Sequence, residues 1–229
     1  MATFTINAFK KANIQGAGSS TFQFARENGA SANNSPGSIS TAFRYLLSTA
    51  RGNQHSIYRS YLLFKTGTIT GTVPTGTSAV LNITGHNFND GDFIVIKSTA
   101  FAGDGTANAT TSDFFNSLDY STAYSGQETT WNTGANTISL NSTALTDIYA
   151  NNFFIVALVN YTHDYLNTAS TSQVSINNGI SFGSAITLVV TEGGGGPGNI
   201  TSINTITKAN VTSMNTIALA NIDEINTIS

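Results

Sequence analysis

Short apolar runs separated by clusters of Gly, Asn and Asp follow one another along most of this chain. Six of these runs are rich in Leu, Ile, Val, Phe and Thr, and they occupy residues 60–70, 79–85, 92–98, 136–142, 153–161 and 185–192. Short strands with turn residues between them are typical of an all-β sandwich or barrel. The pattern therefore predicts an all-β fold for the body of the chain.

Three stretches depart from the strand pattern and predict helices. The first covers residues 38–52, where Gly52 would end a helix whose apolar face consists of Ile39, Phe43, Leu46, Leu47 and Ala50. The second is a short helix after a cap-like Ser112. The third begins at Ser142, with Leu145 and Ile148 three residues apart. Single turns of this kind are common in the loops of a sandwich.

The last part of the chain is a repeat of eleven residues. Residues 200–210, 211–221 and 222–229 align without gaps, and each copy has Asn-Thr-Ile at the same place, starting at Asn204, Asn215 and Asn226. Apolar residues recur at three positions of each copy. Residues 193–198, Gly-Gly-Gly-Gly-Pro-Gly, form a flexible linker before the repeat.

The spacing of the repeat favours a β-solenoid or a β-prism-like structure. Ile, Thr and Asn are poor helix formers, and apolar offsets of 0, 3 and 6 do not stay on one helical face, which argues against an eleven-residue coiled coil. About three stacked copies are the minimum for a solenoid that supports itself, and this chain has two and a fraction. The tail is therefore expected to form a homotrimer with its own copies or to dock on a different protein. The alternative is a strand-forming extension that folds against its own body. The expected oligomerisation residues are Ile200, Ile203, Ile206, Val211, Met214, Ile217, Ile222, Ile225 and Ile228.

The pattern divides the chain into four parts. Residues 1–20 are an N-terminal arm or first strand, 21–192 the body, 193–198 the linker and 199–229 the repeat tail. Charged residues make up only 9% of the chain and cysteine is absent, so Ser, Thr, Asn and Gly supply the polar surface. This composition is typical of extracellular surfaces, yet the N-terminus has no apolar segment of a signal peptide and no run is long enough to span a membrane. Two kinds of protein fit this combination of features, namely a component of a virion released by lysis and a protein with a dedicated secretion route.

The charges are distributed unevenly. Residues 1–65 carry seven basic residues and one acidic residue, whereas the remainder carries two basic and eleven acidic residues. We expect the two parts to neutralise each other within one fold, with docking of a basic end on an acidic partner as the alternative. Basic residues interleaved with aromatic residues are not found, so binding of nucleic acid is not expected.

The segment from Arg59 to Gly85 resembles the central motif of the DNRLRE-type jelly-roll domains, which are related to carbohydrate-binding modules. The matching residues are Arg59, Tyr61, Leu62, Phe64, Pro74, Ala79, Leu81 and Ile83. The resemblance extends over roughly residues 21–192 and implies a jelly-roll β-sandwich. Lys65 replaces the Asp that usually follows the Phe in that family. The short Ile/Asn repeats resemble the C-terminal ends of bacteriophage structural proteins.

The sequence contains few candidate residues for catalysis, metal binding or sugar binding. His163 and Asp164 are neighbours, as in some hydrolytic sites, but no nucleophile motif accompanies them and a surface loop is the expected setting. The oxygen-rich residues Asn87, Asn89, Asp90 and Asp92 are candidate calcium ligands, although Asp-Gly is also an ordinary hairpin turn. Trp131, Tyr124 and Tyr161 are candidate platforms for a sugar ring, and core positions are the alternative for each. We expect no catalytic residues and no cofactor, with calcium as the one metal to consider.

These observations together predict a non-enzymatic virion structural protein of a bacteriophage. It would serve in capsid decoration, a head fibre or a tail appendage, assemble through its repeats with itself and other virion proteins, and contact host surface glycans. The alternative is a secreted, extracellular carbohydrate-binding module or adhesin. Membrane insertion is not expected.

Overall fold

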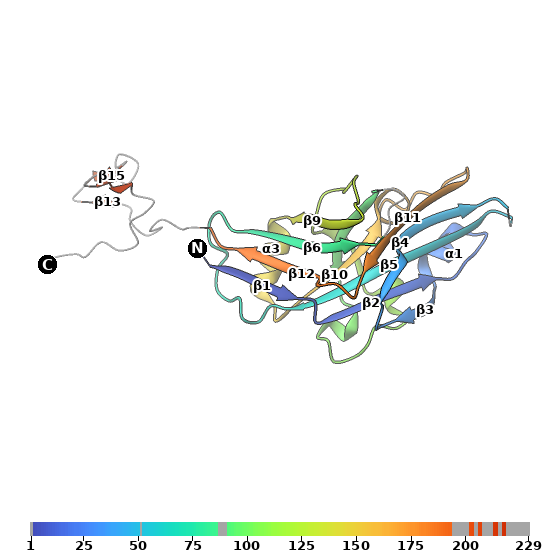
Figure 1. Ribbon diagram of the computed structural model, residues 1–229, viewed down its shortest axis with the longest axis horizontal. Coiled ribbons are helices and arrows are strands. Elements are labelled where there is room, and N and C mark those ends of the chain that lie inside the picture. The colour runs from blue at the N-terminus through green and yellow to red at the C-terminus, as the bar shows by residue number, and fades with distance from the viewer. Residues whose placement is uncertain are drawn as a thin grey trace.

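Twelve strands form one large antiparallel sheet in the described part of the computed structural model, which covers residues 2–50, 52–86 and 91–193 and four short strands of the tail (Figure 1). The body strands are β1 Thr3–Asn7, β2 Lys10–Gly16, β3 Gly29–Asn33, β4 Ser38–Ser48, β5 Gln54–Lys65, β6 Ser78–Gly85, β7 Phe93–Ser98, β8 Leu118–Ala123, β9 Gly134–Leu140, β10 Phe153–Asn160, β11 Val174–Ser181 and β12 Thr187–Thr191. The helical segments are α1 Phe22–Glu27, η1 Phe101–Gly103, α2 Asp113–Asn116, α3 Ser142–Ala150 and the π-helical turn η2 Tyr161–Tyr165. The predicted all-β fold is confirmed.

The strands are ordered β1-β12-β6-β11-β4-β5-β10-β7-β8, with β9 added to β6, β2 to β5 and β3 to β2. The sheet divides at β5. One edge of β5 pairs first with β4, up to Tyr58, and then with β10, from Ser60 onward, while β2 follows the other edge. The strands on either side of this division therefore diverge and enclose apolar space between them.

Two hydrophobic cores lie on opposite faces of β5, β10 and β7. Leu62 and Phe64 of β5 belong to the first core, together with apolar residues of β6, β9, β12 and α3. Tyr61 and Leu63 belong to the second core, which includes Phe114 of α2 and Phe101 of η1. Successive residues of a strand point to opposite faces, so a strand covered on both faces is apolar along its length. This arrangement explains the uninterrupted apolar run of β10.

Two of the three predicted helices are present. The segment after Ser112 forms α2, although Ser112 makes no side-chain cap. Helix α3 begins at Ser142 as predicted, but its cap is the preceding Asn141, whose Oδ1 accepts a hydrogen bond of 3.0 Å from the Ala144 N–H.

The predicted helix over residues 38–52 is wrong, because most of this segment is the strand β4. It pairs with β5 on one edge and with β11 on the other. Phe43 faces the first core, whereas Tyr45 and Leu47 face the second, and the pairing is irregular between Phe43 and Ile39. Phe43 and Leu47 are buried and four residues apart, whereas Arg44 and Leu46 between them are partly exposed. A spacing of four residues fits one side of a helix as well as one face of a strand, which explains the wrong prediction.

Of the two expectations for the first twenty residues, an arm or a first strand, residues 2–20 contain strands, and these pair within the large sheet. Strand β1 pairs with β12, and β2 pairs with β5 and β3. The N–H of Glu192 donates to the carbonyl of Ala2 at 2.9 Å. The body therefore begins and ends side by side, and the tail leaves it beside the N-terminus (Figure 1).

The described part of the tail consists of two pairs of two-residue strands. Strand β13 Ser202–Ile203 pairs with β14 Ile206–Thr207, and β15 Ser213–Met214 pairs with β16 Ile217–Ala218, both antiparallel. The two pairs occupy the same positions of successive repeat copies, so both copies adopt the same local structure. The other expected oligomerisation residues, Ile200, Val211, Ile222, Ile225 and Ile228, and linker residues 194–198 lie outside the described residues.

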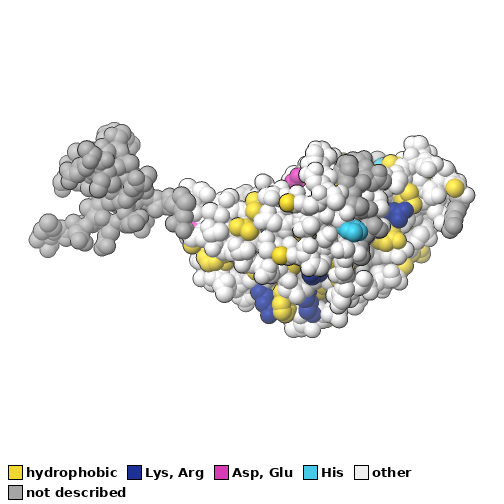
Figure 2. Space-filling model, viewed as in Figure 1, with side chains coloured by type: hydrophobic (Ala, Val, Ile, Leu, Met, Phe, Trp, Pro, Cys, Tyr) yellow, Lys and Arg dark blue, Asp and Glu magenta, His cyan; other side chains and the backbone are white. Residues whose placement is uncertain are grey.

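The charges of the two parts of the chain meet inside the body. Arg26 and Arg59 from the basic part form ion pairs with Asp164 from the acidic part. In the view of Figure 2, lysine and arginine side chains form a few small groups among hydrophobic side chains. Among the described residues, two basic side chains of the first part are therefore paired with an acidic side chain of the second part inside one fold. As for membranes, the helices described here are all too short or too polar for a transmembrane span.

Two leucines allow the buried central strand to be tested. Leu158 of β10 is fully buried, whereas Leu166 is 50% exposed. We expect Leu158→Ala to lower the free energy of unfolding by about 2–5 kcal/mol, because it leaves a cavity in the first core. Leu166→Ala, the matched control, should change it by less than about 0.5 kcal/mol. Urea denaturation measures both, and equal effects would contradict the assignment of β10 to the core.

Candidate functional site

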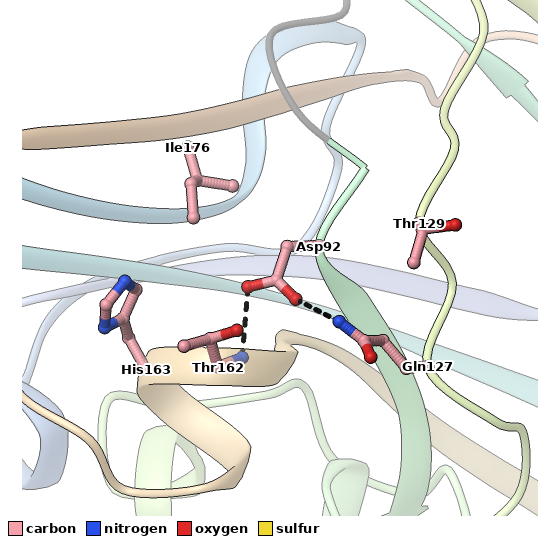
Figure 3. Close-up of a pocket in the computed structure, with 6 residues that line it drawn as sticks. All are labelled: Asp92, Gln127, Thr129, Thr162, His163 and Ile176. Carbon is pink, nitrogen blue, oxygen red and sulfur yellow. Dashed lines mark hydrogen bonds between the residues drawn. The ribbon is translucent and has the colours of Figure 1, made fainter.

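A polar hollow of about 310 Å³ lies where β7, β11 and η2 meet the loop between β8 and β9. Its walls are built by Asp92, Gln127, Thr129, Thr162, His163 and Ile176 (Figure 3). These residues are far apart in the sequence, and strand pairing brings them together. The backbone at 129–130 passes so close to Gly91 that a Cβ at that position would overlap it. Glycine at position 91 is therefore a requirement of this wall.

The carboxylate of Asp92 is held by neutral donors. Its Oδ1 accepts a hydrogen bond from Gln127 Nε2 at 2.9 Å, and its Oδ2 accepts from the Thr162 N–H and from Asn160 Nδ2, both at 3.0 Å. Asn160 Nδ2 also donates to the Asp92 carbonyl at 2.8 Å. Asp92 thus joins the start of β7 to the start of η2 and orders one wall of the hollow.

His163 forms the opposite wall in a defined tautomer. Its Nδ1 lies 2.6 Å from the carbonyl oxygen of Thr168. A carbonyl oxygen only accepts hydrogen bonds, so the neutral ring carries its hydrogen on Nδ1 and a lone pair on Nε2. The backbone N–H of His163 donates to Asn160 Oδ1 at 2.8 Å, which fixes the turn.

An aromatic stack supports the His163 ring. Tyr45 lies parallel to it, with ring centroids 3.9 Å apart and an interplanar angle of 25°. The Tyr45 hydroxyl accepts a hydrogen bond from the Ser170 N–H at 3.1 Å, so its own hydrogen is free to bond His55 Nδ1 at 2.9 Å. Burial raises the pKa of Tyr45, and it lowers the pKa of His55, to which the nearby His163 also contributes.

Asp164, the neighbour of His163, is fully buried and bound to arginine. Arg59 donates from Nε to Asp164 Oδ2 at 2.6 Å and from Nη2 to Oδ1 at 2.7 Å. Tyr120 donates its hydroxyl hydrogen to Oδ1 at 2.8 Å, and Arg26 Nε donates to the Asp164 carbonyl at 2.9 Å. Charge-assisted bidentate contacts of this kind are the strongest hydrogen bonds available to side chains.

The remaining donors of Arg59 hold two helices. Its Nη2 donates to the Arg26 carbonyl of α1 at 2.8 Å, and its Nη1 donates to the Phe114 carbonyl of α2. The guanidinium also lies 3.9 Å from the Phe114 ring centroid. Burial alone would lower the pKa of Arg59, but the charge of Asp164 raises it above its ordinary value. For the Tyr120 hydroxyl, burial raises the pKa.

The expectation that His163 and Asp164 lie in a surface loop is wrong. Asp164 is inaccessible to solvent and His163 is 9% exposed. They do not form a catalytic pair either, because His163 bonds the Thr168 carbonyl while Asp164 bonds Arg59. The sequence carries one sign of this arrangement, since an arginine inside the apolar strand that contains Tyr61 and Leu62 requires a buried partner.

Two of the three sugar-platform candidates are core residues. Trp131 is 2% exposed, and its Nε1–H donates to the Gly179 carbonyl at 3.1 Å. Tyr124 is 1% exposed and donates its hydroxyl hydrogen to Asp147. Neither ring can face a ligand, so the platform prediction is wrong for both. Tyr161 is partly exposed and stacks on Tyr165 at 5.6 Å, which leaves it a candidate.

The calcium candidates are described only at one position. Asp92 lies in the hollow, whereas Asn87, Asn89 and Asp90 lie outside the described residues. Among the described residues, no group of three or more His, Cys, Asp or Glu side chains is placed to hold a metal ion. Calcium at this loop stays a prediction.

No protein-family model matches the chain, and no curated protein matches it either. What the site can do therefore follows from its geometry. The hollow offers hydroxyl groups, the lone pair of His163 and the Gln127 amide, with Ile176 as an apolar wall, and these groups can hold a small polar ligand by hydrogen bonds.

The buried ion pair has a measurable role in stability. Asp164→Asn should lower the free energy of unfolding by about 3–5 kcal/mol, because Arg59 would keep a buried charge without a counter-charge. As a control, Lys97→Gln breaks the partly exposed ion pair with Asp147, whose N···O distance is 2.8 Å. The control should cost less than about 1 kcal/mol. Comparable losses in both variants, measured by urea denaturation, would contradict the role of Asp164.

His55 makes the stability dependent on pH. Because burial lowers its pKa in the folded protein, the unfolded chain binds a proton at higher pH than the folded protein does. The contribution of His55 to stability is complete above about pH 6.5 and decreases as the pH falls below that value. We expect His55→Asn to reduce the fall in Tm between pH 7 and pH 5, measured by calorimetry. The exposed His86 supplies the control His86→Asn, and equal slopes in the two variants would refute the assignment.

Proposed function

We propose that this protein is a non-enzymatic structural protein of a bacteriophage virion, used in capsid decoration, a head fibre or a tail appendage. In this proposal the body is a jelly-roll β-sandwich displayed on the particle. The C-terminal repeat assembles three chains into a β-prism-like joint or anchors the chain to another virion protein. Contact with host surface glycans would be made by the body.

The observation that carries the proposal is the repeated local structure of the tail. Pairing of Ser202–Ile203 with Ile206–Thr207 recurs eleven residues later, in the pairing of Ser213–Met214 with Ile217–Ala218. Two strands of two residues each are marginal in water, and their apolar side chains gain stability only when something covers them. Copies of the same tail supply identical edges and identical apolar positions, which supports assembly between chains.

The geometry of the body is compatible with display. The chain leaves the body at the end where β1 begins, and Gly193 N–H donates to Thr77 Oγ1 at 3.3 Å there. The long strands β4, β5 and β11 extend toward the other end (Figure 1). An anchor at one end would therefore leave the other end free to meet a host surface. A secreted carbohydrate-binding module or adhesin is the alternative.

The tail is tested by light scattering coupled to size exclusion. Full-length protein should elute at three times the mass of one chain, and the truncated chain 1–193 should elute as a folded monomer. Ile203→Asp should dissociate the trimer, because Ile203 is an expected contact position, whereas the adjacent Ser202→Asp should not.

A full-length monomer at concentrations up to about 100 μM would contradict homotypic assembly and leave docking on a different protein as the use of the tail. Neighbouring genes test the virion assignment independently. Genes for capsid, portal or tail proteins are expected on either side, and a polysaccharide-utilisation cluster would instead favour the secreted module.

A further inference from the structure

Among the described residues that line the hollow, Asp92 is the only charged one, and no lysine or arginine accompanies it. Neutral groups hold its carboxylate, namely the amides of Gln127 and Asn160 and the N–H of Thr162. Asp92 takes part in none of the ion pairs observed among the described residues. The negative charge beside the hollow is therefore not balanced by a described side chain, and it repels an anionic ligand.

Hydrogen-bond acceptors outnumber fixed donors among the side chains of the hollow. His163 donates from Nδ1 to the Thr168 carbonyl, so its Nε2 offers a lone pair, and this nitrogen makes no hydrogen bond to a described residue. Oε1 of Gln127 accepts no hydrogen bond from a described residue, and Oδ1 of Asp92 accepts one and can accept another. The second amide hydrogen of Gln127 is the one fixed donor among these lining side chains, because threonine hydroxyls both donate and accept.

The three acceptors line one space and two of them are held in place. In Figure 3 the Asp92 carboxylate lies between the His163 ring and the Gln127 amide, and one nitrogen of the ring points toward Ile176. All four residues line the same hollow of about 310 Å³. Stacking on Tyr45, with ring centroids 3.9 Å apart, holds the His163 ring, and three hydrogen bonds hold the carboxylate. Groups that are already ordered need little rearrangement on binding, which lowers its cost.

These features select the chemistry of a ligand, which should carry positive charge, donate several hydrogen bonds and accept few. A primary ammonium group has one positive charge and three N–H donors, and it accepts no hydrogen bond. A neutral sugar has no charge, and its hydroxyl lone pairs meet few donors here. A quaternary ammonium has the charge but no donor. A metal ion is less well served, because the described residues contain no group of three or more His, Cys, Asp or Glu side chains placed to hold one.

We infer that the hollow at Asp92 binds a primary ammonium group attached to a short carbon chain. The ammonium donates to the Asp92 carboxylate, to His163 Nε2 and to Gln127 Oε1. Its carbon chain lies against the apolar side chain of Ile176. The group is the end of a lysine side chain of a partner protein or of a free aliphatic diamine, and both share this chemistry. The inference goes beyond the proposed function and depends neither on the repeat nor on the virion assignment.

The test is an NMR titration of the full-length, ¹⁵N-labelled protein with n-butylammonium chloride at constant ionic strength. The control ligands are 1-butanol, which has the carbon chain without the charge, tetramethylammonium, which has the charge without N–H donors, and glucose and calcium chloride. We expect butylammonium to shift the resonances of the Thr162 N–H and the Gln127 side-chain amide until they saturate. Each control should bind at least about tenfold more weakly, because it lacks either the charge or the N–H donors.

Two further ligands distinguish the sources of the ammonium group. The methylamide of Nα-acetyl-lysine represents a lysine within a protein chain, and putrescine represents a free diamine. Tighter binding of the lysine derivative than of putrescine would assign the hollow to a partner protein, and the reverse order would assign it to a diamine. Both orders support the inference, because both ligands present the same primary ammonium group.

Variants locate the binding. Asp92→Asn keeps the shape of the side chain but removes the charge, and it should weaken butylammonium binding at least about tenfold. The matched control is Asp104→Asn, which should leave binding unchanged. It removes an exposed carboxylate that also accepts hydrogen bonds from neutral donors, the N–H and the hydroxyl of Thr106, at 2.8 and 2.7 Å. If Asp92→Asn fails to fold, Gln127→Ala changes an exposed residue and should weaken binding about threefold.

Several results would overturn the inference. Absence of saturable shifts with butylammonium would do so, as would butanol, glucose or calcium binding as tightly as butylammonium, which would indicate a site for a different ligand. Equal losses in Asp92→Asn and Asp104→Asn would mean that only the overall charge of the protein matters. Unchanged binding in Gln127→Ala and Asp92→Asn would place the ammonium elsewhere. None of these results changes the mass of the full-length assembly, so failure of this site and failure of the proposed function are distinguishable.

Discussion

The ion pair between Arg59 and Asp164 is the interaction on which the rest of the body depends. Arg59 extends from the central strand β5 into the second core and binds the Asp164 carboxylate and the backbones of α1 and α2. Two fully buried charges are tolerated only when both are paired and their remaining hydrogen-bonding groups are satisfied. The pair therefore requires η2, α1 and α2 to occupy fixed places over the sheet.

The ion pair between Arg59 and Asp164 fixes one wall of the hollow at Asp92. Because His163 and Asp164 are adjacent in η2, anchoring Asp164 in the interior holds the His163 ring against Tyr45, at the edge of the hollow. The Arg59 guanidinium is satisfied by the protein itself.

The body and the tail differ in structure, and this difference is consistent with the proposed function. The body has two cores and a buried, hydrogen-bonded ion pair. The described part of the tail consists of two pairs of two-residue strands, and in the proposed function another chain covers its apolar residues. A stable domain joined to a segment that is stable only when assembled is a suitable arrangement for a component of a larger particle.

The sequence by itself determined six of the twelve body strands, the helices α2 and α3 and the eleven-residue repeat, because each depends on a local pattern of apolar, turn and capping residues. The six strands are β5, β6, β7, β9, β10 and β12. It misled at β4, where Phe43 and Leu47 lie four residues apart on the buried face of a strand and have the spacing of one side of a helix. Only the tertiary structure decided that Asp164 is buried, that Trp131 belongs to the core, and that Arg44 lies beside Asn177. These properties depend on which distant strands pair and in which register, and a one-residue change of register would reverse the face of every side chain.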